Sequence, residues 1–341
     1  MLEKKEIITP LNPPKFIHVA YHIHQQLFQD GLMISGFYNW HRAFGGEFAY
    51  YSLVRDKIKD YDIIFVGVSK PELDGCIMSR IREDLGPNSK AIVVACVDYA
   101  VEMWQNTFLP AQLKYELDKA DFIFASEIAM LSHLQALLPH RKIYHLIHPT
   151  DTGQLKRFTK PYDMRRNALL AIIHRYDNNW LDMYLATHSL EKETDVYAIM
   201  LDSGIKVDIL KYFKYTKDPE SYGRFIEFLS EAKVCTESYH RIHSYGRIPV
   251  ECACLKVPVV STDIVTSAKI FWPDTTVLAG DVYGQSKMLE RLLHDEEFYI
   301  NVTEKAYNAI EAVNYPNSVK RLIDMIEGRL PDILSKPKER S

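Results

Sequence analysis

Short, nearly continuous runs of apolar residues recur along the chain and predict buried strands. In the first half these runs are residues 16–21, 61–67, 91–97, 122–125 and 142–147. Segments with helical spacing separate them, including residues 47–58 and 109–119. Strands without polar alternation are typical of parallel sheets that helices cover on both faces. The first half therefore predicts an α/β domain with a parallel sheet.

The same pattern begins again after a polar connection at residues 149–157. The second set of apolar runs comprises residues 167–173, 196–201, 231–236, 257–261 and 276–279. Residues 284–330 then have an almost entirely helical pattern, broken at residues 314–317, where a proline prevents simple continuation of a helix. Two similar α/β domains that face each other across a cleft are expected.

Length and composition agree with two ordinary globular domains. The chain has 341 residues, which exceeds the size at which a single core usually keeps growing. Hydrophobic residues make up 47% and charged residues 25%, so a large core can be buried without disulfides or metals. The net charge of −4 gives no overall attraction to nucleic acid, although it is compatible with a locally basic groove.

The cysteine count and the apolar runs bear on location. Five cysteines without a Cys-x-x-Cys pair argue against a disulfide framework or a structural zinc site. The expected location is the cytoplasm. No stretch approaches the length of a membrane span, so any membrane association is expected to be peripheral.

The most informative segment runs from Ser244 through Glu251 to Ser261 and predicts a loop, a short helix and a buried strand. Gly246 permits a backbone conformation that other residues rarely adopt, and Pro249 suits the first turn of a helix. The N-terminus of that helix would direct free N–H groups at a phosphate, and Glu251 is placed to accept hydrogen bonds from sugar hydroxyls. A nucleotide sugar offers both groups.

This segment resembles the donor-site signature of retaining GT-B glycosyltransferases of the glycogen-synthase and mannosyltransferase type (glycosyltransferase group 1). In that signature a Glu-x7-Glu pattern frames Gly-Phe-Gly and continues into Glu-Ala-x-Ala-x-Gly-x-Pro-Val-Val. Glu251 takes the place of the second glutamate, which implies a contact with the ribose. His243 replaces the first glutamate, which contacts the transferred sugar, and Lys256 replaces the glycine that ends the helix.

The resemblance implies a GT-B fold, in which two Rossmann-like domains face a cleft and a C-terminal helix crosses back to the first domain. The expected parts are an acceptor domain at residues 1–158, a donor domain at residues 159–313, and a return helix with the tail at residues 314–341. Residues 318–328 match the return helix itself.

Further donor-side residues also follow from the resemblance. Gly45 and Gly46 resemble a glycine pair that approaches the donor phosphates and the acceptor, although such a pair before a helix is more often a plain turn. Arg175 is expected to bind the diphosphate through its planar guanidinium, the alternative being a surface arginine at a strand end. The complete expected donor set is Gly45, Gly46, Arg175, Ser244, Tyr245, Gly246, Arg247 and Glu251.

A companion lysine of the family is missing. Asn178 or Asn179 stands in its place, which is expected to weaken stabilisation of the leaving group unless Arg247 or Lys269 substitutes. The aromatic segment 212–215 lies where the family's second domain turns around the nucleobase, although aromatic residues at such spacing are more often core.

Asp98 is the main candidate on the acceptor side. It follows the strand at residues 91–97 and would either orient the acceptor hydroxyl or accept its proton, with helix capping as the alternative. Together with His243 it forms the expected catalytic pair. His22 and His24 are further acceptor-side candidates.

No metal site and no cofactor are expected, and the donor nucleotide is expected to be UDP or GDP. His22 and His24 have no third ligand in register. Asp60-Tyr-Asp62 precedes a strand and is interpreted as a turn instead of the metal-binding Asp-x-Asp of other glycosyltransferases.

The predicted function is sugar transfer from a nucleotide-diphosphate sugar to a hydroxyl acceptor, with retention. The acceptor class stays open among glycan, lipid, protein and modified nucleic acid. The alternatives are a nucleotide-sugar 2-epimerase, a non-catalytic nucleotide-sugar binder, and a phage-type enzyme that glycosylates DNA bases.

Overall fold

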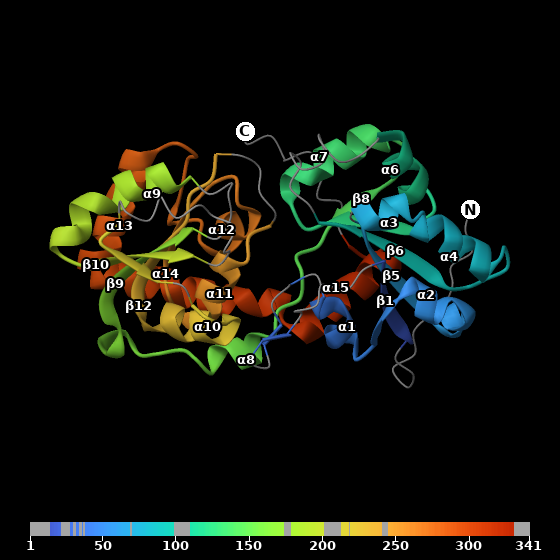
Figure 1. The fold of residues 1–341 in the computed structure, drawn as a ribbon, viewed down its shortest axis with the longest axis horizontal. Coiled ribbons are helices and arrows are strands. Elements are labelled where there is room, and N and C mark those ends of the chain that lie inside the picture. Colours follow the sequence, from blue (N-terminus) through green and yellow to red (C-terminus); the bar gives the residue numbers. More distant parts are fainter. Residues whose placement is uncertain are drawn as a thin grey trace.

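The chain folds into two α/β domains, each built on a six-stranded parallel sheet (Figure 1). This computed structural model describes residues 14–21, 28–29, 32–33, 36, 38–68, 70–98, 110–173, 179–200, 213–217, 219–240 and 245–330. A short antiparallel pair, β2 (Phe28–Gln29) and β3 (Leu32–Met33), belongs to neither large sheet.

The first sheet has the strand order β4-β1-β5-β6-β7-β8. These strands are β1 (Phe16–Ala20), β4 (Glu47–Tyr50), β5 (Ile63–Val68), β6 (Ile92–Val97), β7 (Phe122–Ala125) and β8 (Ile143–His145). The helices of this domain are α1 (Asn39–Phe44), α2 (Tyr51–Val54), α3 (Lys70–Asp74), α4 (Ile77–Leu85), α6 (Pro110–Leu117) and α7 (Ile128–Leu137).

Alternate residues of the central strands supply two different cores. In β5, Ile64 and Val66 join the core beneath α4, α6 and α7, whereas Ile63 and Phe65 join the core on the opposite face. Because successive side chains of a strand point to opposite faces, a strand buried on both sides must be apolar throughout. This explains the continuous apolar runs of the sequence.

The C-terminal helix α15 (Tyr315–Ile326) completes the second of these cores. Leu322 and Met325 are fully buried there beside Trp40, so residues near the end of the chain cover a first-domain sheet. Figure 1 shows α15 lying with α1 on the first-domain side. The Tyr315 hydroxyl donates a hydrogen bond to Asn39 Oδ1 at 2.7 Å, which fixes the start of α15 against α1.

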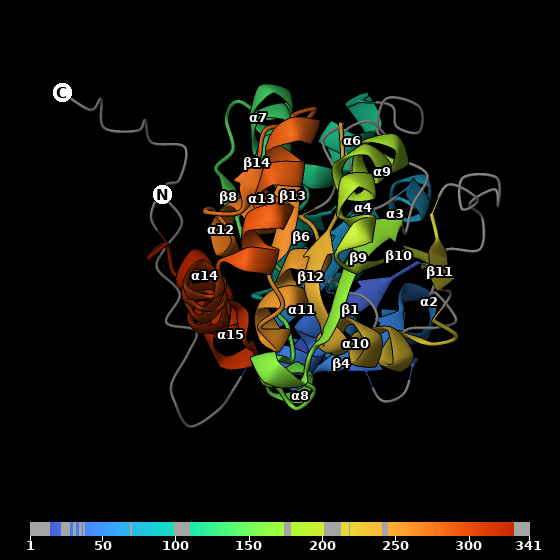
Figure 2. The ribbon, with the colours of Figure 1, turned by 90° about the vertical axis from the view of Figure 1, so that its left-hand side faces the viewer.

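The second sheet has the order β11-β10-β9-β12-β13-β14. Its strands are β9 (Arg166–Ile173), β10 (Asp195–Met200), β11 (Tyr215–Lys217), β12 (Ala232–Thr236), β13 (Val259–Thr262) and β14 (Thr276–Val277). The helices after the first domain are α8 (Thr152–Lys156), α9 (Trp180–Thr187), α10 (Tyr222–Glu231), α11 (Ile248–Leu255), α12 (Thr266–Phe271), α13 (Val282–His294) and α14 (Glu296–Ala309). In Figure 2 the pair α9 and α13 lies above the pair α10 and α11, with strands of the sheet between them.

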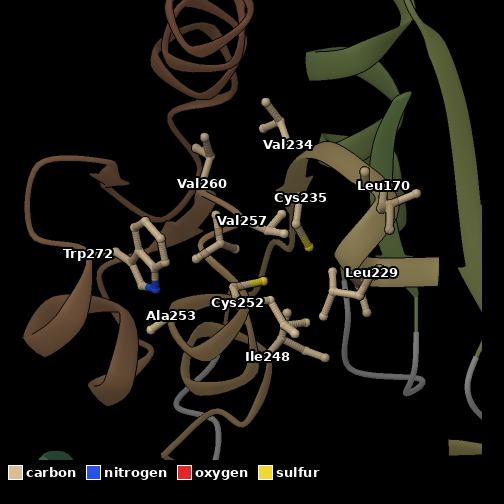
Figure 3. Packing of buried hydrophobic residues seen from close by; sticks show 14 of the residues in the cluster. Leu170, Leu229, Val234, Cys235, Ile248, Cys252, Ala253, Val257, Val260 and Trp272 are labelled. Carbon is tan, nitrogen blue, oxygen red and sulfur yellow. The ribbon is translucent and has the colours of Figure 1, made fainter. Parts of the chain in front are cut away.

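Helix α11 lies within the core of the second domain. All eight of its residues are buried, and Figure 3 shows Cys252 and Cys235 inside this core. All five cysteines of the chain are free. Trp272 is 1% exposed and donates its indole N–H to the Pro249 carbonyl at 2.8 Å, which holds the first turn of α11 in place.

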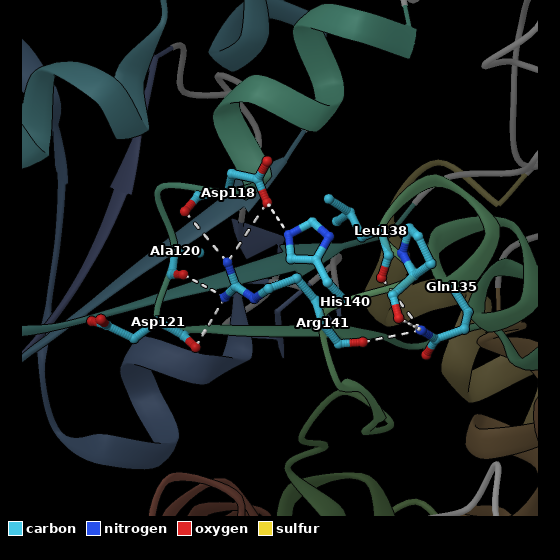
Figure 4. A network of polar contacts seen from close by, with 8 residues as sticks. Asp118, Ala120, Asp121, Gln135, Leu138, His140 and Arg141 are labelled. Carbon is cyan, nitrogen blue, oxygen red and sulfur yellow. Dashed lines mark hydrogen bonds and ion pairs between the residues drawn. The ribbon is translucent and has the colours of Figure 1, made fainter. Parts of the chain in front are cut away.

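A polar cluster fastens the loops at the amino ends of β7 and β8 in the first sheet (Figure 4). The Arg141 guanidinium donates hydrogen bonds to the carbonyls of Ala120 and Asp121 at 2.6 and 3.1 Å, and His140 lies 3.2 Å from Asp118. These residues precede β7 and β8 or follow α6, so the cluster ties loops at the amino ends of the strands. We assign it a structural role.

Each of the ten apolar runs predicted from the sequence overlaps a strand of the structure. The predicted helix at residues 47–58 is wrong, because Glu47–Tyr50 forms edge strand β4, followed by the single turn α2 and a 3₁₀ helix at Arg55–Asp60. The helical interruption at residues 314–317 is confirmed, since Asn314 caps α15 and a proline lies in its first turn. Within the described ranges, no helix is long and apolar enough to cross a membrane.

Candidate functional site

The donor segment, residues 245–251, lies at the carboxyl ends of the strands of the second sheet. Gly246 has a φ of +84°, in the left-handed region that favours glycine, and its carbonyl accepts a hydrogen bond from Ser267 Oγ at 2.7 Å. The Tyr245 carbonyl accepts another from the Ser267 backbone at 2.8 Å. Gly246 therefore turns the chain into α11 as the sequence predicts, and α12 holds that turn from behind.

Gly246 is also a point of close packing. A Cβ atom there would lie 2.3 Å from Val265 Cγ1 and 2.8 Å from Ser267 Oγ. We expect Gly246→Ala to lower the free energy of unfolding by about 2–4 kcal/mol, because backbone strain and overpacking add. Gly328→Ala is the matched control, since its φ is +72° with nothing within 4 Å of the added Cβ. If urea unfolding shows that both variants lose the same free energy of unfolding, the packing at Gly246 does not add to the cost of the substitution.

Glu251 is buried in a polar network inside the donor segment. Its Oε1 accepts a hydrogen bond from Arg247 Nη2 at 2.7 Å and another from the Tyr222 hydroxyl, and its residue exposure is 3%. Burial raises the pKa of Glu251, and the guanidinium of Arg247 opposes this shift. A ribose hydroxyl would have to share this carboxylate with Tyr222 and Arg247. The sequence did not indicate Tyr222, which reaches Glu251 from α10.

A small hollow of about 20 Å³ opens beside this network, between the two domains. The second domain contributes Tyr222, Tyr245, Arg247 and Glu251, and the first half contributes Gly36, Asn39, Thr150, Asp151 and Gln154 among others. This is space for about one water molecule, so a nucleotide would enter only if lining side chains moved. The hollow places three of the predicted donor residues on one surface.

Asp98 lies at the carboxyl edge of the first sheet, as predicted, with its side chain 17% exposed. Ser126 Oγ donates a hydrogen bond to Asp98 Oδ1 at 2.6 Å, and His148 Nε2 lies 2.8 Å from Oδ2. Trp40 Nε1 donates to His148 Nδ1 at 3.1 Å. Ser126 directly follows β7, so the rule that ligand sites gather at the carboxyl ends of parallel strands would have found it.

Gly45 and Gly46 lie at the amino ends of the strands of the first sheet. The resemblance had placed them near the donor phosphates and the acceptor, so this expected placement is corrected. Gly45 ends α1 with a φ of +63°, and a Cβ on Gly46 would lie 2.4 Å from the carbonyl oxygen of Phe16, the first residue of β1. Because β1 and β4 are parallel, this is the amino end of both strands. The two glycines serve the turn into β4, and the strand length separates them from the donor segment.

Lys256 shows how the chain does without the glycine of the family signature. It ends α11 in the left-handed conformation with a φ of +56°, which is the conformation that the glycine would adopt. Its Nζ pairs with Glu304 and lies 4.4 Å from the centre of the Tyr307 ring. These contacts accompany a backbone strain that is uncommon for a lysine.

Several predicted residues lie outside the part of the chain that the structure describes. These are His22, His24, Arg175, Asn178, Tyr212, His243 and Ser244.

Of the proposed substitutes for the missing lysine, Arg247 is directed at Glu251, and Lys269 lies on α12. Asp62 Oδ2 accepts a hydrogen bond from the Lys15 backbone at 2.8 Å. Among the described residues no group of three or more His, Cys, Asp and Glu side chains could hold a metal ion.

Glu127 lies where the first domain contacts the second, and the sequence did not indicate it. Its side chain caps α7 by accepting a hydrogen bond from the Ala129 backbone N–H at 3.1 Å. The backbone N–H of Ile128, the residue between them, donates to Thr266 Oγ1 of the second domain at 3.1 Å. Burial raises the pKa of Glu127 to about 7, against the opposing effects of Thr266 and the Ala129 N–H. Lys269 also lowers this pKa, and Asp98 raises it.

A pH-dependent contribution to stability follows from Glu127. Its pKa in the folded chain exceeds the ordinary value of 4.5, so stability is lost as the pH rises from about 4.5 to about 7. We expect Glu127→Gln to be more stable than the wild type by up to about 3 kcal/mol at pH 8, with little difference near pH 4.5. Thermal unfolding at both pH values measures this. A stability gap that does not change with pH would contradict it.

No protein-family model matches the sequence. No curated protein matches it either. Solved structures do match in fold. Anabaena HepE in complex with UDP and glucose aligns with a TM-score of 0.64 at 11% identity, over 92% of this chain and 100% of that chain. An α-glucosyltransferase in complex with UDP and a 13-mer DNA containing an HMU base aligns with a TM-score of 0.65 at 12% identity, over 92% and 100%.

The N-terminal domain of Candida albicans trehalose-6-phosphate phosphatase aligns with a TM-score of 0.66 at 12% identity, over 86% of this chain and 75% of that one. The chain has the GT-B fold. The predicted fold class is thereby confirmed: two parallel sheets face a cleft, and the C-terminal helix returns to the first domain. In this fold Asp98 and the donor segment lie on opposite sides of one cleft.

Proposed function

We propose that the chain is a glycosyltransferase that takes a sugar from a uridine diphosphate sugar and passes it to a hydroxyl group. The donor segment carries this proposal. Gly246 turns the chain into α11 at the carboxyl edge of the second sheet, and Glu251 lies one turn inside, beside the hollow between the domains. Helix N-termini at such edges suit phosphates. The choice of uridine is supported by HepE and the α-glucosyltransferase, whose structures hold UDP.

The proposed transfer retains the configuration of the sugar. The bond between its anomeric carbon and the β-phosphate oxygen breaks, and a bond to the acceptor oxygen forms on the same face. The acceptor proton leaves with the released diphosphate. Since this step needs no base from the protein, the proposed role of Asp98 is to orient the acceptor hydroxyl from the first domain.

A hydroxyl group on a DNA base is a specific candidate acceptor. The observation that favours it is the match over 92% of the chain to an α-glucosyltransferase whose structure contains DNA with an HMU base. The net charge of −4 means that such DNA would have to be held by local contacts. A DNA oligomer that contains the HMU base is therefore the first acceptor to test.

Calorimetric titration with UDP, GDP and ADP tests the donor, and product analysis with UDP-glucose tests the reaction. We expect UDP to bind and UDP-glucose to release UDP. Binding without turnover would favour a non-catalytic binder, and a converted sugar still attached to UDP would favour an epimerase. Failure of all three nucleotides to bind would contradict the proposal.

A further inference from the structure

His148 connects the acceptor side of the cleft to the donor segment. It follows β8 and its ring is fully buried. The indole N–H of Trp40 can only donate, and it is directed at His148 Nδ1 at 3.1 Å. Nδ1 is therefore the acceptor, and the ring proton lies on Nε2, 2.8 Å from Asp98 Oδ2.

The Asp98 carboxylate is thus contacted at both of its oxygens. Oδ1 accepts a hydrogen bond from Ser126 Oγ at 2.6 Å, and Oδ2 lies 2.8 Å from His148 Nε2, in a close contact without hydrogen-bond alignment. Both partners belong to segments that follow neighbouring strands, β7 and β8. A carboxylate restrained from two sides keeps one orientation, and 17% of the Asp98 side chain stays exposed.

The same histidine contacts the donor segment. The rings of His148 and Tyr245 meet edge to face, with centroids 5.0 Å apart and planes at 82°. Gly36 packs against both residues, since a Cβ there would lie 2.3 Å from Tyr245 Oη and 3.1 Å from His148 Cβ. Tyr245 precedes the glycine that turns the chain into α11. A shift of the donor segment would therefore press on the histidine that holds Asp98.

We propose that His148 is a positioning residue, which fixes the Asp98 carboxylate relative to the donor segment so that the acceptor hydroxyl is aligned with the sugar. The proposal rests on the proposed function. It assigns to His148 the orientation of the Asp98 carboxylate and to Trp40 the choice of the His148 tautomer. Tyr245 supplies the contact that fixes His148 relative to the donor segment.

Two substitutions separate positioning from packing. His148→Phe keeps an aromatic ring against Tyr245 but removes the N–H that faces Asp98. His148→Gln places an amide N–H near the position of Nε2 and keeps the contact with Asp98. With UDP-glucose as donor and water as acceptor, we expect kcat to fall about 10- to 100-fold in the first variant. The second variant keeps the contact with Asp98 but loses the ring against Tyr245, so its kcat should fall less, by about three- to tenfold.

The affinity for UDP should stay within about threefold in both variants, because residue 148 does not line the hollow beside Glu251 and meets the donor segment through Tyr245. His133→Phe, an exposed position on α7, is the matched control and should change neither quantity. If His148→Phe fails to fold, Ser126→Ala removes the other restraint on Asp98, and the same selective loss of kcat is expected. An unchanged kcat in a folded His148→Phe variant that binds UDP would overturn the proposal.

One readout does not depend on activity. Nitrogen-15 NMR of the wild type should show His148 with its proton on Nε2, and Trp40→Phe should release that preference. A proton on Nδ1 in the wild type would overturn the positioning proposal even if UDP binds. A wild type with the Nε2 proton that fails to bind UDP would overturn the proposed function instead.

Discussion

Glu251→Gln is expected to lower both the free energy of unfolding and the affinity for a UDP-sugar. The substitution leaves Arg247 without its carboxylate at 2.7 Å. Removing one partner of a fully buried pair costs about 3–5 kcal/mol, and we expect about 2–3 kcal/mol here because the Arg247 side chain is 28% exposed. Losing a charge-assisted contact with the ribose should also weaken donor binding about tenfold or more.

The matched control for this prediction is Glu304→Gln. Glu304 pairs with Lys256 at the surface, where its side chain is 48% exposed, so the substitution should cost no more than about 1 kcal/mol. The double variant Arg247→Met with Glu251→Leu separates the two effects. It should recover most of the stability, since a buried ion pair can be replaced by apolar packing, but not the donor affinity. A Glu251→Gln variant that binds UDP-glucose as the wild type does would remove Glu251 from the donor site.

Asp98→Asn is expected to lower kcat of transfer or donor hydrolysis by roughly 100-fold, with UDP affinity within about twofold of the wild type. The carboxamide keeps the shape of the side chain. It loses the charge, however, and its NH₂ group cannot accept from Ser126 or face the N–H of His148 as a carboxylate oxygen does. Initial rates with UDP-glucose, together with calorimetry, measure the two quantities separately.

Asp118→Asn is the matched control for this second prediction. Asp118 lies in the cluster of Figure 4, at the amino ends of the strands and not at the carboxyl ends where Asp98 lies, and its side chain is 35% exposed. It should leave kcat unchanged. Equal activity of Asp98→Asn and Asp118→Asn would show that Asp98 takes no part in the reaction.

The strands and the turn of the donor segment could be predicted from the sequence because their causes are local. A strand buried on both faces needs consecutive apolar residues, as in Ile63–Val68, and a left-handed turn needs a residue such as Gly246. The position of Asp98 followed from the same reasoning, since it comes directly after a buried strand. These predictions need no knowledge of distant parts of the chain.

The errors and omissions have a different cause. Glu47–Tyr50 forms an edge strand that is only partly buried, so its pattern of polar and apolar residues is equally compatible with the helix that was predicted. The contact of Trp40 with His148 joins residues 108 positions apart, and that of Tyr222 with Glu251 joins residues 29 apart. Tertiary packing creates such contacts, and no local pattern marks them.

Phosphorus-31 NMR of UDP-glucose during incubation with the protein tests the central claim most directly. The signals of the sugar-linked diphosphate should be replaced by those of free UDP, slowly in water and faster when a DNA oligomer with the HMU base or another hydroxyl acceptor is added. Glu251→Gln should slow this release. If the UDP-glucose signals neither shift on binding nor decline with time, the chain is not a UDP-glucose-dependent glycosyltransferase.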